Sequence, residues 1–128
     1  MATEIQQAAR VQVLVIDDQH RVFFDIIEKL EQAMRSGRGG PLVPLLFEEL
    51  RRLADYHFGT EERLMESYGY PLRDMHRLQH EAAWARLRNP PADMTAVEML
   101  DRLKEWLQEH IAAWDAKLGE YLNDRGVD

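Results

Sequence analysis

The sequence contains no cysteine. This absence excludes disulfides, thiolate zinc sites, iron–sulfur clusters and cysteine nucleophiles. The sequence also lacks a glycine-rich phosphate-binding motif and a nucleophile elbow, so neither phosphate-loop nor serine chemistry finds support. Any metal site in this chain must therefore be built from histidine, aspartate and glutamate side chains.

Positive charge is scarce, with 16 Lys and Arg against 23 Asp and Glu and a formal net charge of −7. A nucleic-acid partner would need a basic face, so that class of function is excluded. Long apolar runs are missing too. The stretch from Val11 to Ile16 is too short for a signal peptide, and no segment approaches the length of a membrane span. We therefore expect a cytoplasmic protein with no membrane partner.

Glycine and proline are few, at 7 and 5 residues, and they gather at three places, 37–41, 69–71 and 89–91. Each cluster is typical of a helix end or a turn. The chain has 128 residues, of which 45% are hydrophobic, and this amount suits one compact domain over 1–128. The three clusters divide that domain into four segments.

Apolar residues recur every three or four positions in each segment, the pattern of amphipathic helices. The predicted helices cover about 17–35, 42–66, 72–88 and 96–123, and Thr95 with Glu98 forms a capping box before the last one. Short connections force neighbouring helices to run in opposite directions. Alternating β-branched residues predict an extended N-terminal arm over about 1–16. The expected fold is therefore all-α, an antiparallel up-down four-helix bundle with an extended arm.

The inner helix faces contain ionisable side chains where a bundle core should be apolar. These residues are His20, His57, Glu61, His76, His80, His110 and Asp115. A single inward histidine is usually a hydrogen-bonded core residue, and a single inward glutamate usually reaches water. The whole set is a different case, because each unpaired buried carboxylate costs several kcal/mol in a domain stabilised by only about 5–15 kcal/mol. Metal ions would neutralise the carboxylates and use the imidazole lone pairs, so the sequence predicts a metal centre.

Two pairs of these residues lie four positions apart: His57 with Glu61, and His76 with His80. Each pair shares a helix face and can chelate a common site. His110 and Asp115 lie five positions apart, roughly 140° around an α-helix, which suits one terminal ligand and one bridging carboxylate.

The number of ligands indicates two metals, because seven are too many for one ion. Two six-coordinate metals offer twelve positions, and five imidazoles, two bridging carboxylates and a bridging oxide or hydroxide fill all but one of them. One position stays open. Imidazole with carboxylate suits iron, manganese, copper or zinc, so the residues alone leave the metal undecided.

Five stretches of the sequence resemble the hemerythrin family in its single-domain bacterial form. They are 16–20 (IDDQH), 57–65 (HFGTEERLM), 69–71 (GYP), the pair His76 and His80, and 106–115 (WLQEHIAAWD). Each motif alone is weak, but their order and spacing together are specific. The resemblance covers nearly the whole chain.

The resemblance implies a cofactor of two iron ions joined by an oxide or hydroxide. The three histidines His76, His80 and His110 would bind one iron, His20 and His57 the other, and Glu61 and Asp115 would bridge the pair. Dioxygen would then bind at the open position of the second iron. Phe58 and Leu107 match positions that line the family's oxygen pocket, and Trp114 is expected beside Asp115 at this pocket.

The function implied by the resemblance is reversible dioxygen binding by a carrier, storage or delivery protein that is not an enzyme. Di-iron oxidases typically use Glu-x-x-His pairs, and this chain contains none. Two alternatives stay open: an oxygen or redox sensor that acts through a partner protein, and a nitric oxide or iron-handling protein. We expect a monomer whose partners are dioxygen and, for delivery or sensing, an oxygen-accepting or signalling protein.

Overall fold

The computed structural model describes residues 10–37 and 40–128, and the regular structure in these residues is entirely helical. The elements are α2 (Leu14–Ser36), α3 (Leu42–Ser67), α4 (Arg73–Arg88), α5 (Ala96–His110), the π-helical turn η1 (Ile111–Asp115) and α6 (Ala116–Asn123). The last three follow one another without a break and form one long helix. None of the described helices is both long and apolar enough to cross a membrane.

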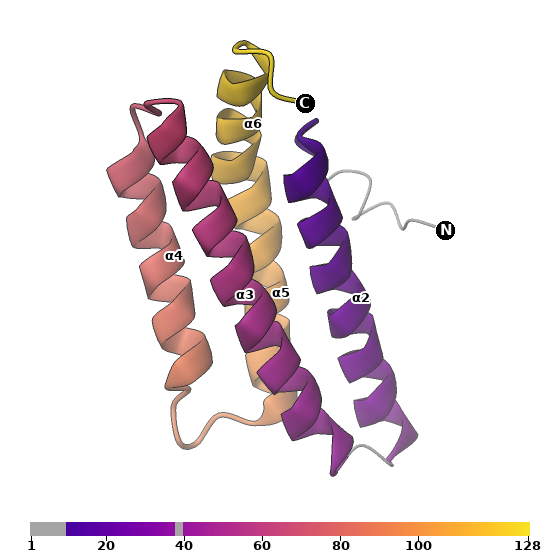
Figure 1. The fold of residues 1–128 in the computed structure, drawn as a ribbon. Helices are drawn as coiled ribbons and strands as arrows, with labels where there is room; N and C mark the ends of the chain where they lie inside the picture. Colours follow the sequence, from indigo (N-terminus) through magenta and orange to yellow (C-terminus); the bar gives the residue numbers. More distant parts are fainter. Residues whose placement is uncertain (1–9, 38–39) are drawn as a thin grey trace.

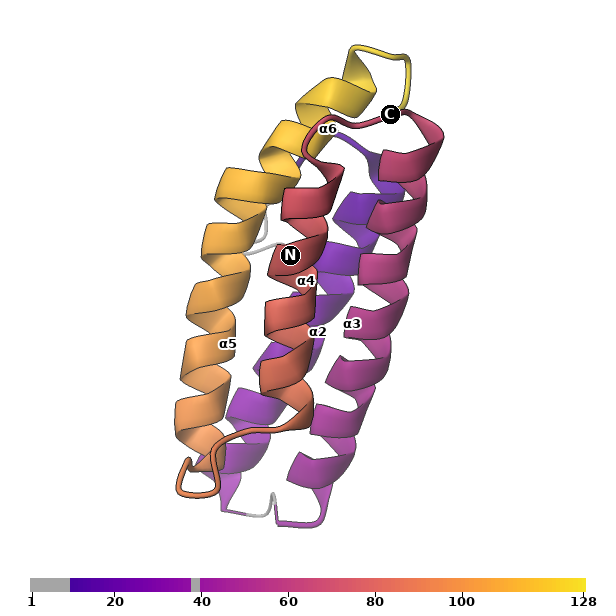
Figure 2. The same ribbon diagram turned by 90° about the vertical axis from the view of Figure 1, so that its left-hand side faces the viewer.

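In the described part of the chain, the bundle has four helical segments, which we call legs: α2, α3, α4 and the continuous helix formed by α5, η1 and α6. The legs run alternately up and down and lie side by side (Figures 1 and 2). Each leg packs beside its neighbour in the chain, and α5 closes the ring against α2. The connections 37–41, 68–72 and 89–95 are short, as the antiparallel arrangement requires. The prediction of an antiparallel four-helix bundle is therefore confirmed.

The start of α2 differs from the prediction, which treated residues up to 16 as an extended arm. The helix begins at Leu14, and only the described residues before it, 10–13, are non-helical. Val13 and Ile16 are buried while Leu14 and Val15 are exposed, so a helical rather than an alternating pattern governs burial here. Packing overrides the weak β preference of these side chains. The predicted arm residues 1–9 lie outside the described residues.

Helix ends follow the local signals that the sequence carries. Thr95 accepts a hydrogen bond from the backbone N–H of Glu98 at 3.1 Å, so the predicted cap of α5 is confirmed. Gly37 ends α2 in the left-handed conformation at φ 70°, which costs glycine little.

One half of the bundle has an ordinary apolar core. Its buried side chains lie where α2 and α4 end and where α3 and α5 begin: Leu30, Ala33, Leu46, Phe47, Leu50, Leu87 and Leu100. The predicted metal ligands occupy the other half. The fold thus separates an apolar half, held by the hydrophobic effect, from a polar half that needs another source of stability.

Candidate metal centre

All seven predicted ligands converge in the polar half of the bundle, and each is at most 2% exposed. Every helical leg contributes: His20 from α2, His57 and Glu61 from α3, His76 and His80 from α4, and His110 and Asp115 from the long last helix. They form two overlapping groups whose candidate ligand atoms lie within 4.8 Å of one another. The two groups share Glu61 and Asp115.

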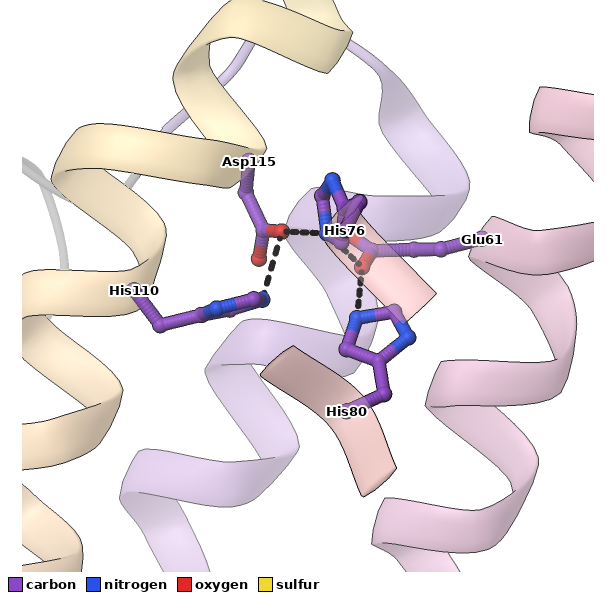
Figure 3. Close-up of side chains that lie close together, drawn as sticks. All are labelled: Glu61, His76, His80, His110 and Asp115. Atoms are coloured by element: carbon purple, nitrogen blue, oxygen red, sulfur yellow. Dashed lines mark hydrogen bonds and ion pairs between the residues drawn. The ribbon is translucent and has the colours of Figure 1, made fainter. Parts of the chain in front are cut away.

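Three histidines occupy one side of the centre (Figure 3). The Nε2 atoms of His76 and His80 lie 3.2 and 2.9 Å from Glu61 Oε1. The Nε2 atoms of His76 and His110 both lie 3.0 Å from Asp115 Oδ1. One oxygen of each carboxylate therefore faces the three-histidine side.

Two histidines occupy the opposite side. His20 Nε2 lies 2.9 Å from Asp115 Oδ2, and His57 Nε2 lies 3.9 Å from the same oxygen. His57 Nε2 also lies 3.6 Å from Glu61 Oε2. The second oxygen of each carboxylate therefore faces the two-histidine side, and both carboxylates lie between the two groups of imidazoles.

The π-helical turn corrects the predicted geometry of His110 and Asp115. On an α-helix, residues five apart would diverge, but the backbone N–H of Ala116 bonds to the carbonyl of Ile111, an i→i+5 hydrogen bond. This wider turn brings Asp115 back over His110, with 3.0 Å between Asp115 Oδ1 and His110 Nε2. The five-residue spacing thus places both side chains on one face.

The electrostatics of the two carboxylates reflect their histidine neighbours. Burial and the charge of Asp115 raise the pKa of Glu61, but the charge of His57 and hydrogen bonds from His76 and His80 outweigh them and lower it to about 2. Burial also raises the pKa of Asp115, yet its charge interaction and hydrogen bonds with the histidines hold this pKa well below the usual range. Both groups are therefore ionised at neutral pH.

His76 lies between the two carboxylates and responds to both. Burial lowers its pKa, but hydrogen bonds with Asp115 and Glu61 raise it to about 9. Tyr70 lies nearby, with its ring centroid 6.4 Å from that of His76. Burial and the charges of Asp115 and Glu61 raise the pKa of the Tyr70 phenol. Without a cation, the centre therefore retains a proton on His76 to balance part of its negative charge.

A second set of polar side chains, which the sequence prediction missed, surrounds the ligands. Gln19 Oε1 lies 2.6 Å from His57 Nδ1, and Gln19 Nε2 donates to Thr60 Oγ1 at 3.1 Å. On the other side, Glu62 Oε2 lies 3.4 Å from His80 Nδ1. Gln19 directly precedes the predicted ligand His20, and Thr60 and Glu62 flank the predicted ligand Glu61. Position beside a predicted ligand was the only sequence signal for these residues.

Aromatic rings pack around the centre. Phe58 stacks on His80 with ring centroids 4.2 Å apart, and Trp106 stacks on His110 at 4.5 Å. Phe23 and Phe58 lie against His57, at 5.4 and 5.9 Å between centroids. The two-histidine side thus has apolar walls.

The three predicted pocket residues take different places. Phe58 contacts histidines of both sides, as described above, and Leu107 is buried one turn before His110. Trp114 is half-buried, and its ring lies 5.9 Å from that of His76, on the three-histidine side. The assignment of these residues to an oxygen pocket stays a prediction.

Comparison with known proteins places the chain in a family. The family model described as "Hemerythrin HHE cation binding domain" matches residues 12–122. The chain is 31% identical to a bacteriohemerythrin of Stenotrophomonas maltophilia (strain R551-3) over 118 residues, which cover 86% of this chain and 74% of that protein. It is 27% identical to a bacteriohemerythrin of Clostridium acetobutylicum over 119 residues, covering 84% of this chain and 89% of that protein.

A third relative shows a similar identity. The chain is 31% identical to a hemerythrin of Phascolopsis gouldii over 103 residues, covering 80% of this chain and 78% of that protein. No solved structure gives a significant match. The family model spans most of the chain and includes all seven buried histidines and carboxylates of the centre, so this chain belongs to the hemerythrin family.

Proposed function

We propose that this protein binds dioxygen reversibly at a di-iron centre held by the seven converging residues. One observation carries the proposal: Glu61 and Asp115 each turn one oxygen toward the three-histidine side and the other toward the two-histidine side. A carboxylate with its oxygens divided in this way is suited to bridge two cations. Two separate single-metal sites would not require the same two carboxylates.

An unpartnered polar atom at the centre supports a cation. Glu61 Oε2 is buried and has no hydrogen-bond partner among the described residues, since His57 Nε2 lies 3.6 Å away. Buried polar atoms without partners destabilise a fold unless another group satisfies them. Carboxylate oxygens and imidazole nitrogens are the donors that iron accepts, so the residues fit this metal.

The two sides supply different numbers of protein ligands. The three-histidine group has five residues and the two-histidine group has four, with Glu61 and Asp115 in both. With a shared oxide or hydroxide, the first metal would reach six ligands and the second only five. We therefore place the open position on the side of His20 and His57.

Two ferrous ions held by these residues would supply the two electrons that dioxygen takes up on binding and returns on leaving. Phe23 and Phe58 pack against His57 and keep water out of the two-histidine side, which makes that exchange reversible. The ligand set of five imidazoles and two carboxylates carries little negative charge. It therefore stabilises high-valent iron less than carboxylate-rich sites do, which favours binding over oxidation.

The test is a visible spectrum of the reduced, iron-loaded protein, recorded before air, after air and after deoxygenation. We expect a charge-transfer band that appears with oxygen and disappears when oxygen is removed. Irreversible conversion to the ferric form would favour a sensor, and oxygen consumption with substrate turnover would favour an enzyme. Either result would contradict the proposal of a reversible carrier, storage or delivery protein.

A further inference from the structure

We propose that Gln19 is a positioning residue that holds His57 in the tautomer able to bind metal and weakens its donation compared with a carboxylate partner. The inference rests on the proposed di-iron function. It concerns the outer nitrogen of His57, since His57 Nδ1 lies 2.6 Å from Gln19 Oε1 while its Nε2 faces Glu61 and Asp115.

The Thr60 hydroxyl determines the direction of the hydrogen bonds that Gln19 makes. This hydroxyl donates to the carbonyl of Tyr56 at 2.9 Å, which leaves Thr60 Oγ1 as an acceptor. Two donors use it: Gln19 Nε2 at 3.1 Å and the guanidinium NH2 of Arg63 at 3.4 Å. Arg63 can only donate, so it favours the same direction. The amide nitrogen of Gln19 is thereby fixed toward Thr60.

The amide oxygen of Gln19 consequently faces His57. Because this oxygen can only accept a hydrogen bond, His57 Nδ1 must carry a proton and donate it. A neutral imidazole has one N–H, so His57 Nε2 is left with a lone pair that points into the centre. If the oxygen and nitrogen of the Gln19 amide exchanged places, the Thr60 hydroxyl would have to donate to Gln19 instead of the Tyr56 carbonyl. His57 Nδ1 would then accept from Gln19, and the proton on His57 Nε2 would prevent that nitrogen from binding metal. Gln19 and Thr60 thus select the metal-binding tautomer.

The outer nitrogens on the three-histidine side have no such amide partner. His80 Nδ1 faces a carboxylate, Glu62 Oε2, at 3.4 Å, and the buried Nδ1 atoms of His76 and His110 have no hydrogen-bond partner among the described residues. A carboxylate partner makes an imidazole a stronger donor, whereas an amide does so less. The short, buried contact with the Gln19 amide therefore lies on the two-histidine side, where we place the open position.

The test compares Gln19→Glu and Gln19→Leu in the iron-loaded, full-length protein, with Gln32→Glu on the exposed face of α2 as a control for added charge. Two quantities are measured: the midpoint potential of the centre, and the rate of metal loss to a chelator. Gln19→Glu should shift the potential to more negative values, and Gln19→Leu to more positive values. Gln19→Leu should also weaken metal binding by about 10–100-fold, the usual cost of losing such a partner.

Shifts of opposite sign identify an effect on His57 as a donor, because a packing defect would shift both variants in the same direction. Unchanged potentials in Gln19→Glu and Gln19→Leu, in proteins that hold full iron, would overturn this inference and leave the proposed function intact. A wild-type protein that takes up no iron would overturn both. The near-isosteric Gln19→Glu keeps the test decisive if Gln19→Leu fails to fold.

Discussion

Asp115 shows how much one residue contributes to the centre. It ends the π-helical turn, has no exposed surface, and reaches His76 and His110 with one oxygen and His20 with the other. Its partner Glu61 is arranged in the same way between the two sides. Each carboxylate therefore contacts both groups of histidines, so removing either should affect both of the proposed metals.

Replacing Asp115 with asparagine keeps the shape of the side chain but removes its charge and one of the two oxygens proposed to bind metal. We expect metal affinity to fall by more than the roughly 100-fold that loss of an outer partner can cost, together with the melting temperature of the iron-loaded protein. Asp124→Asn, an exposed position just after α6, is the matched control. Elemental analysis and calorimetry provide the measurement, and unchanged iron content in Asp115→Asn would count against the bridging role.

His76 gives the metal-free protein a pH dependence. Its pKa is raised from 6.5 to about 9, so protonated His76 stabilises the fold fully below pH 6.5, and this contribution is lost as the pH rises through about 9. The melting temperature of metal-free protein should therefore fall between these values. In the loaded protein a cation replaces the proton, and the fall should disappear. A metal-free His76→Gln variant that kept the same slope would assign it to other groups.

The amino-acid sequence was sufficient to predict that the seven ionisable residues lie in the core, because helical periodicity places all of them except Asp115 on an inner stripe, and the π-helical turn brings Asp115 to the same face. It was not sufficient to find Gln19 and Thr60. A polar residue beside a ligand has the same sequence signature whether it faces water or holds a ligand. Only the three-dimensional structure shows that Gln19 and Thr60 are buried and directed toward His57.

Among the elements, the long last helix departs most from the prediction. One continuous α-helix was expected over 96–123, and the structure inserts the π-helical turn η1 between α5 and α6. Periodicity at 3.6 residues per turn cannot reveal such a turn, because the extra residue only rotates the pattern that follows. Similarly, alternating valines suggested an extended arm, although α2 already begins at Leu14.

Close contact between the N-terminal residues and α6 depends on Gly119. A Cβ atom at this position would lie 2.8 Å from Val11 Cβ and also close to the Val11 backbone. Val11 is itself tied to α2, because its N–H donates to Asp17 Oδ1 at 2.7 Å. The approach therefore leaves no room for a larger residue unless residues 11–13 move.

Gly119→Ala should lower the free energy of unfolding by about 1–3 kcal/mol, since overpacking outweighs the gain in helix propensity. Gly59→Ala is the control, because a Cβ there would meet only the flexible end of Arg63, at 3.3 Å. It should stabilise α3 by up to about 1 kcal/mol. Denaturant unfolding measures both, and a stabilised Gly119→Ala variant would show that residues 11–13 yield without cost.

At the scale of the whole molecule, stability comes from two different sources in the two halves of the bundle. The apolar half packs residues such as Leu30, Leu50 and Leu100, whereas the polar half concentrates seven ionisable groups contributed by all four legs. Metal ions would therefore crosslink every leg at one level. Iron at about 1,000 times its dissociation constant should stabilise the fold by roughly 4 kcal/mol, a gain that calorimetry of loaded and metal-free protein would measure.

Anomalous diffraction at the iron absorption edge, from crystals of the iron-loaded protein, would locate the metals themselves. We predict two peaks of similar height inside the bundle, one beside His76, His80 and His110 and the other beside His20 and His57, with Glu61 and Asp115 between them. A single peak, or no peak among these residues in fully folded protein, would contradict the di-iron centre.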